Sequence, residues 1–296
     1  MHAPHPHRSE DRARALDPAR ALLPFWDDRP PGARATVFCL PHVGGGASAY
    51  RTWVRARATL DVQPVQLPGR EQLIDSPGIE RMPELAALIG SLITDLAPGP
   101  FVLFGHSMGG AIATEVAAWL RRAGHPLPAL IAVSARPPVN HVRPDPGTPE
   151  DDWLVERVLS AGGTPAELLE DPELREILLG TIRSDLRLLR DYEPAFGRLP
   201  VPLLALGGTE DDVTESRLAA WQDHFSAPIR VRMFPGGHFY LRQHRDAVLA
   251  AVEEALAEAG AASPTAGGPT AASPTAGGPT AGASLTAEGR STAHGA

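Results

Sequence analysis

Short apolar runs alternate along this chain with segments whose apolar residues recur at helical spacing. The runs predict strands at 35–40, 62–67, 101–104, 129–134, 201–206 and 229–234. The segments between them predict helices at 48–58, 83–96, 109–123, 215–225 and 243–257. Strands that alternate with helices predict an α/β fold, a mostly parallel sheet with helices on both faces. Reactive groups in such sheets gather at the carboxyl ends of the strands.

The alternation is interrupted between Arg136 and Leu199, where no strand pattern occurs. Capping patterns predict three helices in this stretch, which begin at Thr148, Thr164 and Asp171. The third helix carries an apolar stripe, which we expect to pack against the core: Leu174, Ile177, Leu178, Ile182, Leu186 and Leu189. A helical insertion between two strands predicts a lid over about residues 137–199, with Arg136-Pro-Pro138 and Phe196–Pro200 as hinges.

The two ends of the chain differ from the middle. The segment Ala261–Thr270 is repeated identically at 271–280, and residues 259–296 hold almost no charge and few large apolar side chains. Such a composition predicts a disordered tail, and we expect residues 1–21 to be similarly loose. The folded domain is therefore predicted at 22–258. The N-terminus lacks the apolar core of a signal peptide and no run is long enough for a membrane span, so we expect a cytoplasmic protein.

Composition excludes several classes of function. The chain has 296 residues, a net charge of −8 and one cysteine, so an internal disulfide is excluded. That residue, Cys39, lies in a predicted strand and is expected to be buried. All basic residues are arginine and none form a basic run, which argues against nucleic acid as a partner.

The strongest chemical signal is Gly105-His-Ser-Met-Gly109, between a predicted strand and a predicted helix. Gly-x-Ser-x-Gly in this context is typical of a nucleophile elbow, a sharp turn that exposes a serine hydroxyl at a helix N-terminus. Side chains at the two flanking glycines would collide with the neighbouring strand and helix. Ser107 is therefore the predicted nucleophile.

A serine nucleophile needs a histidine base and an acid that orients it. Among eleven histidines, His238 follows a predicted strand through the flexible loop Pro235-Gly-Gly237, and it is the predicted base. Three acidic residues, at 210–212, follow the preceding strand and satisfy the chain order serine, acid, histidine. The spacing from Gly208 favours Asp211 as the acid, with Asp212 as the second choice.

Backbone N–H groups must also stabilise the oxyanion that forms during acyl transfer. One is predicted at Met108, directly after the serine. The glycine-rich loop Pro41-His-Val-Gly-Gly-Gly46 follows the first strand and can supply the other, from Val43 or from Gly44. We choose Val43.

Several motifs together make the chain resemble the type II thioesterases of polyketide and nonribosomal peptide synthesis. They span about residues 22–257 and read Pro41-His-Val-Gly-Gly45, Leu67-Pro-Gly-Arg-Glu71, Phe104-Gly-His-Ser-Met-Gly-Gly110, Ser134-Ala-Arg-Pro-Pro138 and Phe234-Pro-Gly-Gly-His-Phe239. The resemblance implies an α/β-hydrolase fold with a helical lid. It also supports Ser107, His238 and Met108 in the roles given above. The acid loop is one or two residues shorter than the family's usual loop, so Asp211 and Asp212 both stay open.

The resemblance further implies hydrolysis of acyl thioesters on the phosphopantetheine arm of acyl or peptidyl carrier proteins. Such enzymes remove stalled acyl groups so that the synthase can resume. We expect no metal and no bound cofactor, because the phosphopantetheine belongs to the substrate, and we favour a monomer. The alternatives are a general acyl-CoA thioesterase or carboxylesterase of the same fold, an acyltransferase or cyclase, and, least favoured, a non-catalytic interaction protein.

Overall fold

The computed structural model describes residues 21–26, 30–96, 99–138, 170–190, 192 and 196–262. Its centre is a six-stranded sheet in the order β2-β1-β3-β4-β5-β6, in which every adjacent pair is parallel. The strands are β1 (Ala35–Leu40), β2 (Leu60–Pro64), β3 (Phe101–His106), β4 (Leu130–Ser134), β5 (Leu203–Gly208) and β6 (Ile229–Phe234). The predicted parallel sheet is confirmed.

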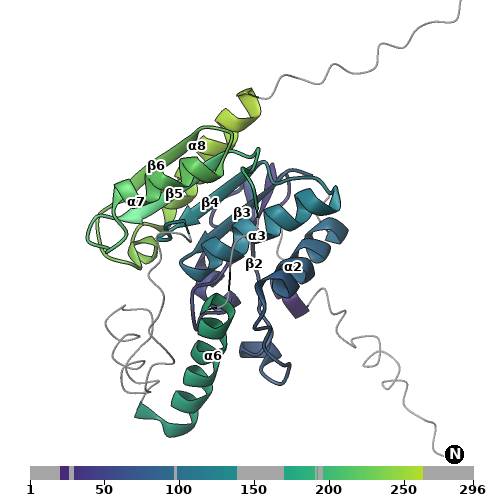
Figure 1. Ribbon diagram of the computed structural model, residues 1–296, viewed down its shortest axis with the longest axis vertical. Coiled ribbons are helices and arrows are strands. Elements are labelled where there is room, and N and C mark those ends of the chain that lie inside the picture. The colour runs from purple at the N-terminus through teal and green to yellow at the C-terminus, as the bar shows by residue number, and fades with distance from the viewer. Residues whose placement is uncertain are drawn as a thin grey trace, which may run out of the picture. The chain divides into compact units, whose positions relative to one another are not determined.

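Helices cover both faces of this sheet (Figure 1). The α-helices are α2 (Met82–Leu96), α3 (Met108–Ala123), α6 (Pro172–Arg190), α7 (Glu215–Ala219) and α8 (Arg245–Ala262). Short 3-10 helices are η2 (Ala47–Trp53), η3 (Glu71–Leu73), η5 (Ala220–His224) and η6 (Tyr240–Arg242). The predicted helices at 83–96 and 109–123 therefore form almost as expected.

Two apolar cores lie on opposite sides of the sheet because neighbouring residues of a strand point to opposite faces. Phe38 of β1 packs in the core that α2 and α3 close, whereas Val37 packs in the core that α8 closes. Every residue of β1, β3 and β4 is buried, as expected for central strands covered on both faces. The edge strand β6 instead alternates between partly buried and exposed positions until Phe234.

Some predicted boundaries were wrong. Strand β2 begins at Leu60 rather than at residue 62, because Asp61 is buried and accepts hydrogen bonds from Thr36 Oγ1 (3.2 Å) and Gln63 Nε2 (2.6 Å). A paired buried carboxylate breaks the apolar pattern on which the prediction relied. The segment predicted as helix 48–58 forms only the 3-10 helix η2, and 215–225 divides into α7 and η5.

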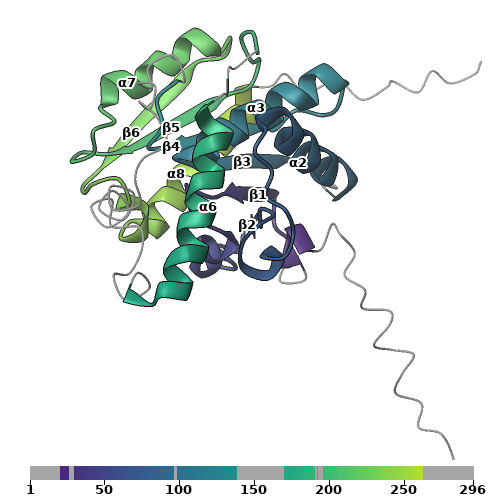
Figure 2. The same cartoon turned by 60° about the horizontal axis from the view of Figure 1, so that its bottom comes forward.

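The apolar stripe of α6 packs only in part. Leu174 and Ile177 are 45% and 44% exposed, so the expectation that they pack in the core was wrong. The buried positions of α6 lie further along the helix, at Leu179, Thr181, Ile182, Asp185 and Leu188. The first turns of α6 project beyond the body of the domain, whereas its later turns cross the carboxyl edge of the sheet (Figures 1 and 2).

Several predictions fall on other parts of the chain. The predicted helices at Thr148 and Thr164, residues 1–20 and the repeat tail from residue 263 lie outside the described residues. The division into a loose start, a domain at 22–258 and a tail stays a prediction, while α8 continues to Ala262. Within the described residues, no helix combines the length and apolar character needed to cross a membrane.

Candidate active site

Ser107 is the single residue between β3 and α3. Its backbone angles, φ 55° and ψ −116°, lie in a region that non-glycine residues rarely adopt. Backbone bonds hold this strained turn from both sides: Ser107 N donates to Ser134 O (2.8 Å), and Gly110 N donates to Ser107 O (3.0 Å). Strain of this kind is typical of a functional site, and here it is the geometry of a nucleophile elbow.

The two glycines of the motif are required by close backbone contacts, as the sequence predicted. A Cβ at position 105 would lie 2.0 Å from Gly109 O, at the start of α3. A Cβ at position 109 would lie 2.1 Å from Leu40 O, at the end of β1. Neither contact can be relieved by a side-chain rotation, because both involve backbone atoms.

Asp211 and His238 form a hydrogen-bonded pair at the carboxyl edge of the sheet. Asp211 follows β5, His238 follows β6, and Nδ1 of the histidine lies 2.8 Å from Asp211 Oδ2. Burial raises the pKa of the Asp211 carboxyl, but the hydrogen bond and charge of His238 and the N–H groups of Val213 and Asp212 outweigh it, so this pKa lies below its ordinary value. Asp212 is exposed. The geometry therefore favours Asp211 over Asp212.

His238 also contacts the elbow. Its ring centroid lies 5.0 Å from that of His106, the residue directly before Ser107. His106 is fully buried, its Nδ1 shares a 2.8 Å hydrogen bond with Ser134 Oγ, and Ser134 Oγ shares another of 2.8 Å with Tyr240 Oη. This chain of three side chains links β3, β4 and η6, and its member His106 contacts the ring of the candidate base. Sequence reasoning missed it, because its members lie on different elements.

The two predicted oxyanion donors lie on different elements. Met108 is the first residue of α3, where a backbone N–H has no intrahelical acceptor. Val43 lies in the loop of residues 41–46 between β1 and η2, which we call the oxyanion loop. Gly44, the alternative to Val43, already donates its N–H to Asp185 Oδ2 on α6 (2.8 Å). Val43 is therefore the better candidate of the two.

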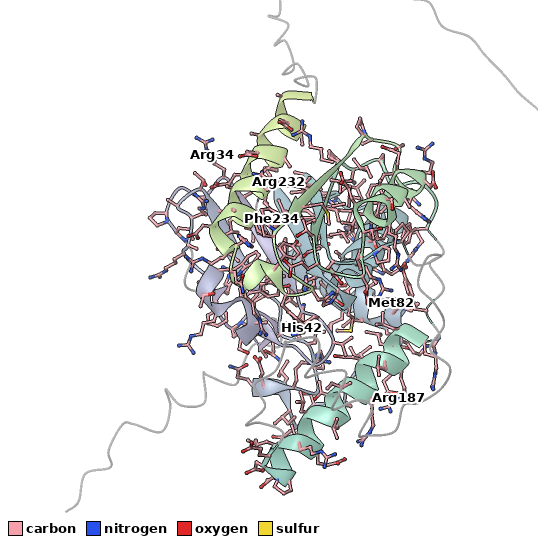
Figure 3. All side chains as sticks on the ribbon, turned by 90° about the vertical axis from the view of Figure 1, so that its left-hand side faces the viewer. Arg34, His42, Met82, Arg187, Arg232 and Phe234 are labelled. Atoms are coloured by element: carbon pink, nitrogen blue, oxygen red, sulfur yellow. The ribbon has the colours of Figure 1, made fainter. Side chains whose placement is uncertain are left out.

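His42, in the same loop, lies on the side of the domain that α6 approaches (Figure 3). Its ring packs edge-on against Phe239, with centroids 4.8 Å apart, and it covers Gly45 closely. Burial and then the charges of Arg242, His238 and Arg70 lower the pKa of His42 to about 3. This histidine is neutral at physiological pH and does not compete with His238 as a proton carrier.

Residues that follow β2 bind both the oxyanion loop and the start of η2. Gln66 Oε1 accepts from Ala47 N (3.2 Å), and Arg70 Nη1 donates to Gly45 O (3.0 Å). Glu71 accepts hydrogen bonds from the hydroxyl of Ser48 (2.5 Å) and from its backbone N–H (3.3 Å). Glu71 adopts φ 48°, a second strained position near the site. The motif Leu67-Pro-Gly-Arg-Glu71 thus binds the segment that follows β1.

A strained serine after β3 and an acid–histidine pair at the same edge of a doubly covered parallel sheet place this protein in the class of α/β-hydrolases. The family to which the chain belongs is narrower than this class. The family model "Thioesterase domain" matches residues 35–256, and the chain belongs to the thioesterase family. It is a thioester hydrolase.

Individual relatives agree with this assignment. The chain is 37% identical over 230 residues to the "probable cadicidin biosynthesis thioesterase" of Streptomyces griseus, covering 76% of this chain but only 63% of that protein. It is 31% identical to the gramicidin S biosynthesis protein GrsT of Aneurinibacillus migulanus, covering 72% of this chain and 85% of GrsT. Among solved structures, the type II thioesterase BorB from the borrelidin biosynthetic cluster is 37% identical, with a TM-score of 0.69 over 77% of this chain and 96% of BorB.

Proposed function

We propose that this protein is an editing thioesterase that releases acyl groups from the phosphopantetheine arm of acyl or peptidyl carrier proteins. Its partners would be carrier domains of a polyketide or nonribosomal peptide synthase in the cytoplasm. The observation that carries the proposal is the Asp211–His238 hydrogen bond of 2.8 Å at the sheet edge that also holds the strained Ser107. The similarity to thioesterases of antibiotic biosynthesis supports the choice of substrate.

The mechanism follows from the roles of these residues. His238 takes the Ser107 proton as Oγ attacks the thioester carbonyl, and the Val43 and Met108 amides stabilise the oxyanion. The C–S bond then breaks, and the protonated His238 gives its proton to the departing pantetheine thiolate. Water attacks the acyl-serine while His238 takes the water proton, and the Ser107 oxygen leaves with that proton. The products are a free acid and a carrier with a free thiol. No step of this mechanism requires a metal or a bound cofactor. That the protein uses neither stays a prediction.

The test is the removal of an acyl group from a purified carrier protein. Acetyl-loaded carrier is incubated with the enzyme, and intact mass spectrometry follows the conversion to the free-thiol carrier. The proposal predicts catalytic conversion by the wild type and none above background by Ser107→Ala. Stable acetyl-carrier in the presence of folded wild-type enzyme, tested with several acyl groups, would overturn it.

A further inference from the structure

A buried ion pair joins α6 to the candidate active site. Arg70 donates to both oxygens of Asp185, from Nη2 to Oδ1 at 2.6 Å and from Nη1 to Oδ2 at 2.8 Å. The two side chains are only 8% and 3% exposed. A buried pair of this kind contributes little net stability, because desolvation of both charges offsets their attraction. Its presence here requires a different explanation.

Both partners also bind the backbone of the oxyanion loop. Asp185 Oδ2 accepts the N–H of Gly44 (2.8 Å), and Arg70 Nη1 donates to the carbonyl of Gly45 (3.0 Å). A third bond, from Gly45 N to His42 O (3.0 Å), fixes the peptide unit between His42 and Val43. Since the N–H and C=O of a trans peptide point in opposite directions, this bond also fixes the direction of the Val43 N–H.

The close approach of α6 depends on Gly44. This residue has φ +74°, and a Cβ added there would lie 3.0 Å from Cγ1 of Ile182 on α6. Asp185 lies one helical turn beyond Ile182, on the same buried face of α6. Helix α6 therefore contacts the oxyanion loop through apolar side chains, which pack against Gly44 and Val43, and through the charged side chain of Asp185.

We propose that Asp185 and Arg70 are positioning residues that orient the Val43 amide, so that the oxyanion hole is complete only while α6 is docked on the oxyanion loop. The proposal rests on the oxyanion role of Val43 proposed above. It assigns a function to the arginine of the Leu67–Glu71 motif and to a carboxylate of α6, although neither touches the reacting atoms. Movement of α6 would remove the acceptor of Gly44 and weaken catalysis without displacing Ser107 or His238.

The test compares variants in catalysis and in affinity for an analogue of the tetrahedral intermediate. Asp185→Asn loses the two-oxygen interaction with Arg70. The double variant Arg70→Met/Asp185→Leu replaces the pair by apolar side chains and is expected to stay folded, because such replacements of buried ion pairs are often neutral or stabilising. Arg187→Gln is the matched control, since Arg187 joins the same helix to Glu80 (2.6 Å) through a half-exposed ion pair (Figure 3).

Three quantities are measured for each variant: kcat and KM on acetyl-carrier, the pH midpoint of kcat/KM, and the affinity for a trifluoromethyl ketone thioether by ¹⁹F NMR. We expect kcat to fall about 10²-fold in Asp185→Asn and in the double variant, as for a displaced or lost oxyanion donor. KM and the pH midpoint should stay close to wild type, and ketone affinity should fall by the same factor as kcat. Arg187→Gln should match the wild type.

Wild-type kcat in the folded double variant would overturn the proposal, and so would a loss of kcat with unchanged ketone affinity. A shifted pH midpoint would show that the pair acts on His238 instead. The ketone measurement requires no turnover, so it reads the oxyanion hole even if the carrier thioester is not the substrate. A wild type that binds the ketone but leaves acetyl-carrier intact would contradict the proposed function alone.

Discussion

Residues with a strong local signature could be predicted from the sequence. Ser107 and its flanking glycines form a motif whose backbone demands are local, and the structure shows the expected strain and the expected collisions. Asp211 was favoured by spacing, and its hydrogen bond to His238 agrees with that choice. Asp185 could not be assigned in this way, because its partner Arg70 lies 115 residues away in the sequence. The only signal was an acidic residue within an apolar helix face.

The first prediction concerns the nucleophile. Ser107→Ala should abolish covalent labelling by a fluorophosphonate, since the reagent bonds only to an activated serine oxygen. The variant should remain folded, because removal of one hydroxyl leaves the backbone turn intact. Labelling is read by intact mass and folding by circular dichroism. Retained labelling at another residue would show that the nucleophile is wrongly assigned.

The second prediction separates the two candidate acids. Asp211→Asn should lower kcat about 10³–10⁴-fold, because an amide cannot stabilise the protonated form of His238 and favours the wrong tautomer. Asp212→Asn is the matched control and should change kcat less than about threefold, since Asp212 is exposed. Steady-state kinetics on one acyl-carrier substrate measures both. Equal losses, or the reverse order, would contradict the choice of Asp211.

Helices were predicted well where the periodicity of their apolar residues reflects burial against the sheet. Helices α2 and α3 pack on the sheet along most of their length, so their apolar faces indicated both their existence and their position. Helix α6 was expected to bury its whole stripe, yet Leu174 and Ile177 are exposed. Periodicity indicates which face of a helix is apolar, but it does not indicate how far the neighbouring surface extends beneath that face.

A substitution in α6 tests the intrinsic stability of this helix. Gly180 lies in the helix interior, and a Cβ there would meet no atom within 4 Å. Gly180→Ala should therefore stabilise the protein by about 0.5–1 kcal/mol, because glycine loses more backbone entropy than alanine in a helix. Urea unfolding measures the change, and kcat should not alter. A destabilised variant would indicate that α6 is distorted or more tightly covered at this position.

At the scale of the molecule, the alternation of strands and helices determined the architecture and the edge at which the site forms. Parallel strands bring their carboxyl ends together, so residues after β1, β3, β5 and β6 meet although they are far apart in the sequence. The pattern could not show how the loops after β1 and β2 bind each other. Those contacts use backbone groups, such as Gly45 O, which carry no signal in the sequence.

The buried histidines make the stability of the domain depend on pH. Burial and the charges of His238, His42 and Arg242 lower the pKa of His106 well below 6.5, and the pKa of His42 is about 3. Below pH 6.5 the unfolded chain therefore binds protons that the folded protein does not bind. Stability should fall as pH decreases through 6.5 toward 5, with a slope that approaches about 1.4 kcal/mol per pH unit for each such histidine below about pH 6.

Thermal unfolding between pH 7 and 5 measures this effect, and His106→Asn should reduce the slope, because asparagine does not titrate and its amide can still reach Ser134. The carboxylates with lowered pKa values, Asp211 among them, lose their contribution only at lower pH. A melting temperature that is constant over this range, or a slope unchanged in the variant, would contradict the burial of neutral histidines.

The central claim is that the substrate is a thioester presented by a carrier protein. A carrier offers a protein surface that free coenzyme A lacks, and binding energy from that remote surface can position the thioester against Ser107. The most direct measurement compares kcat/KM for the same short acyl group on a carrier protein and on coenzyme A, from initial rates below saturation. We predict a clearly higher kcat/KM on the carrier. Equal values on both substrates would contradict carrier recognition and indicate a general acyl-CoA thioesterase.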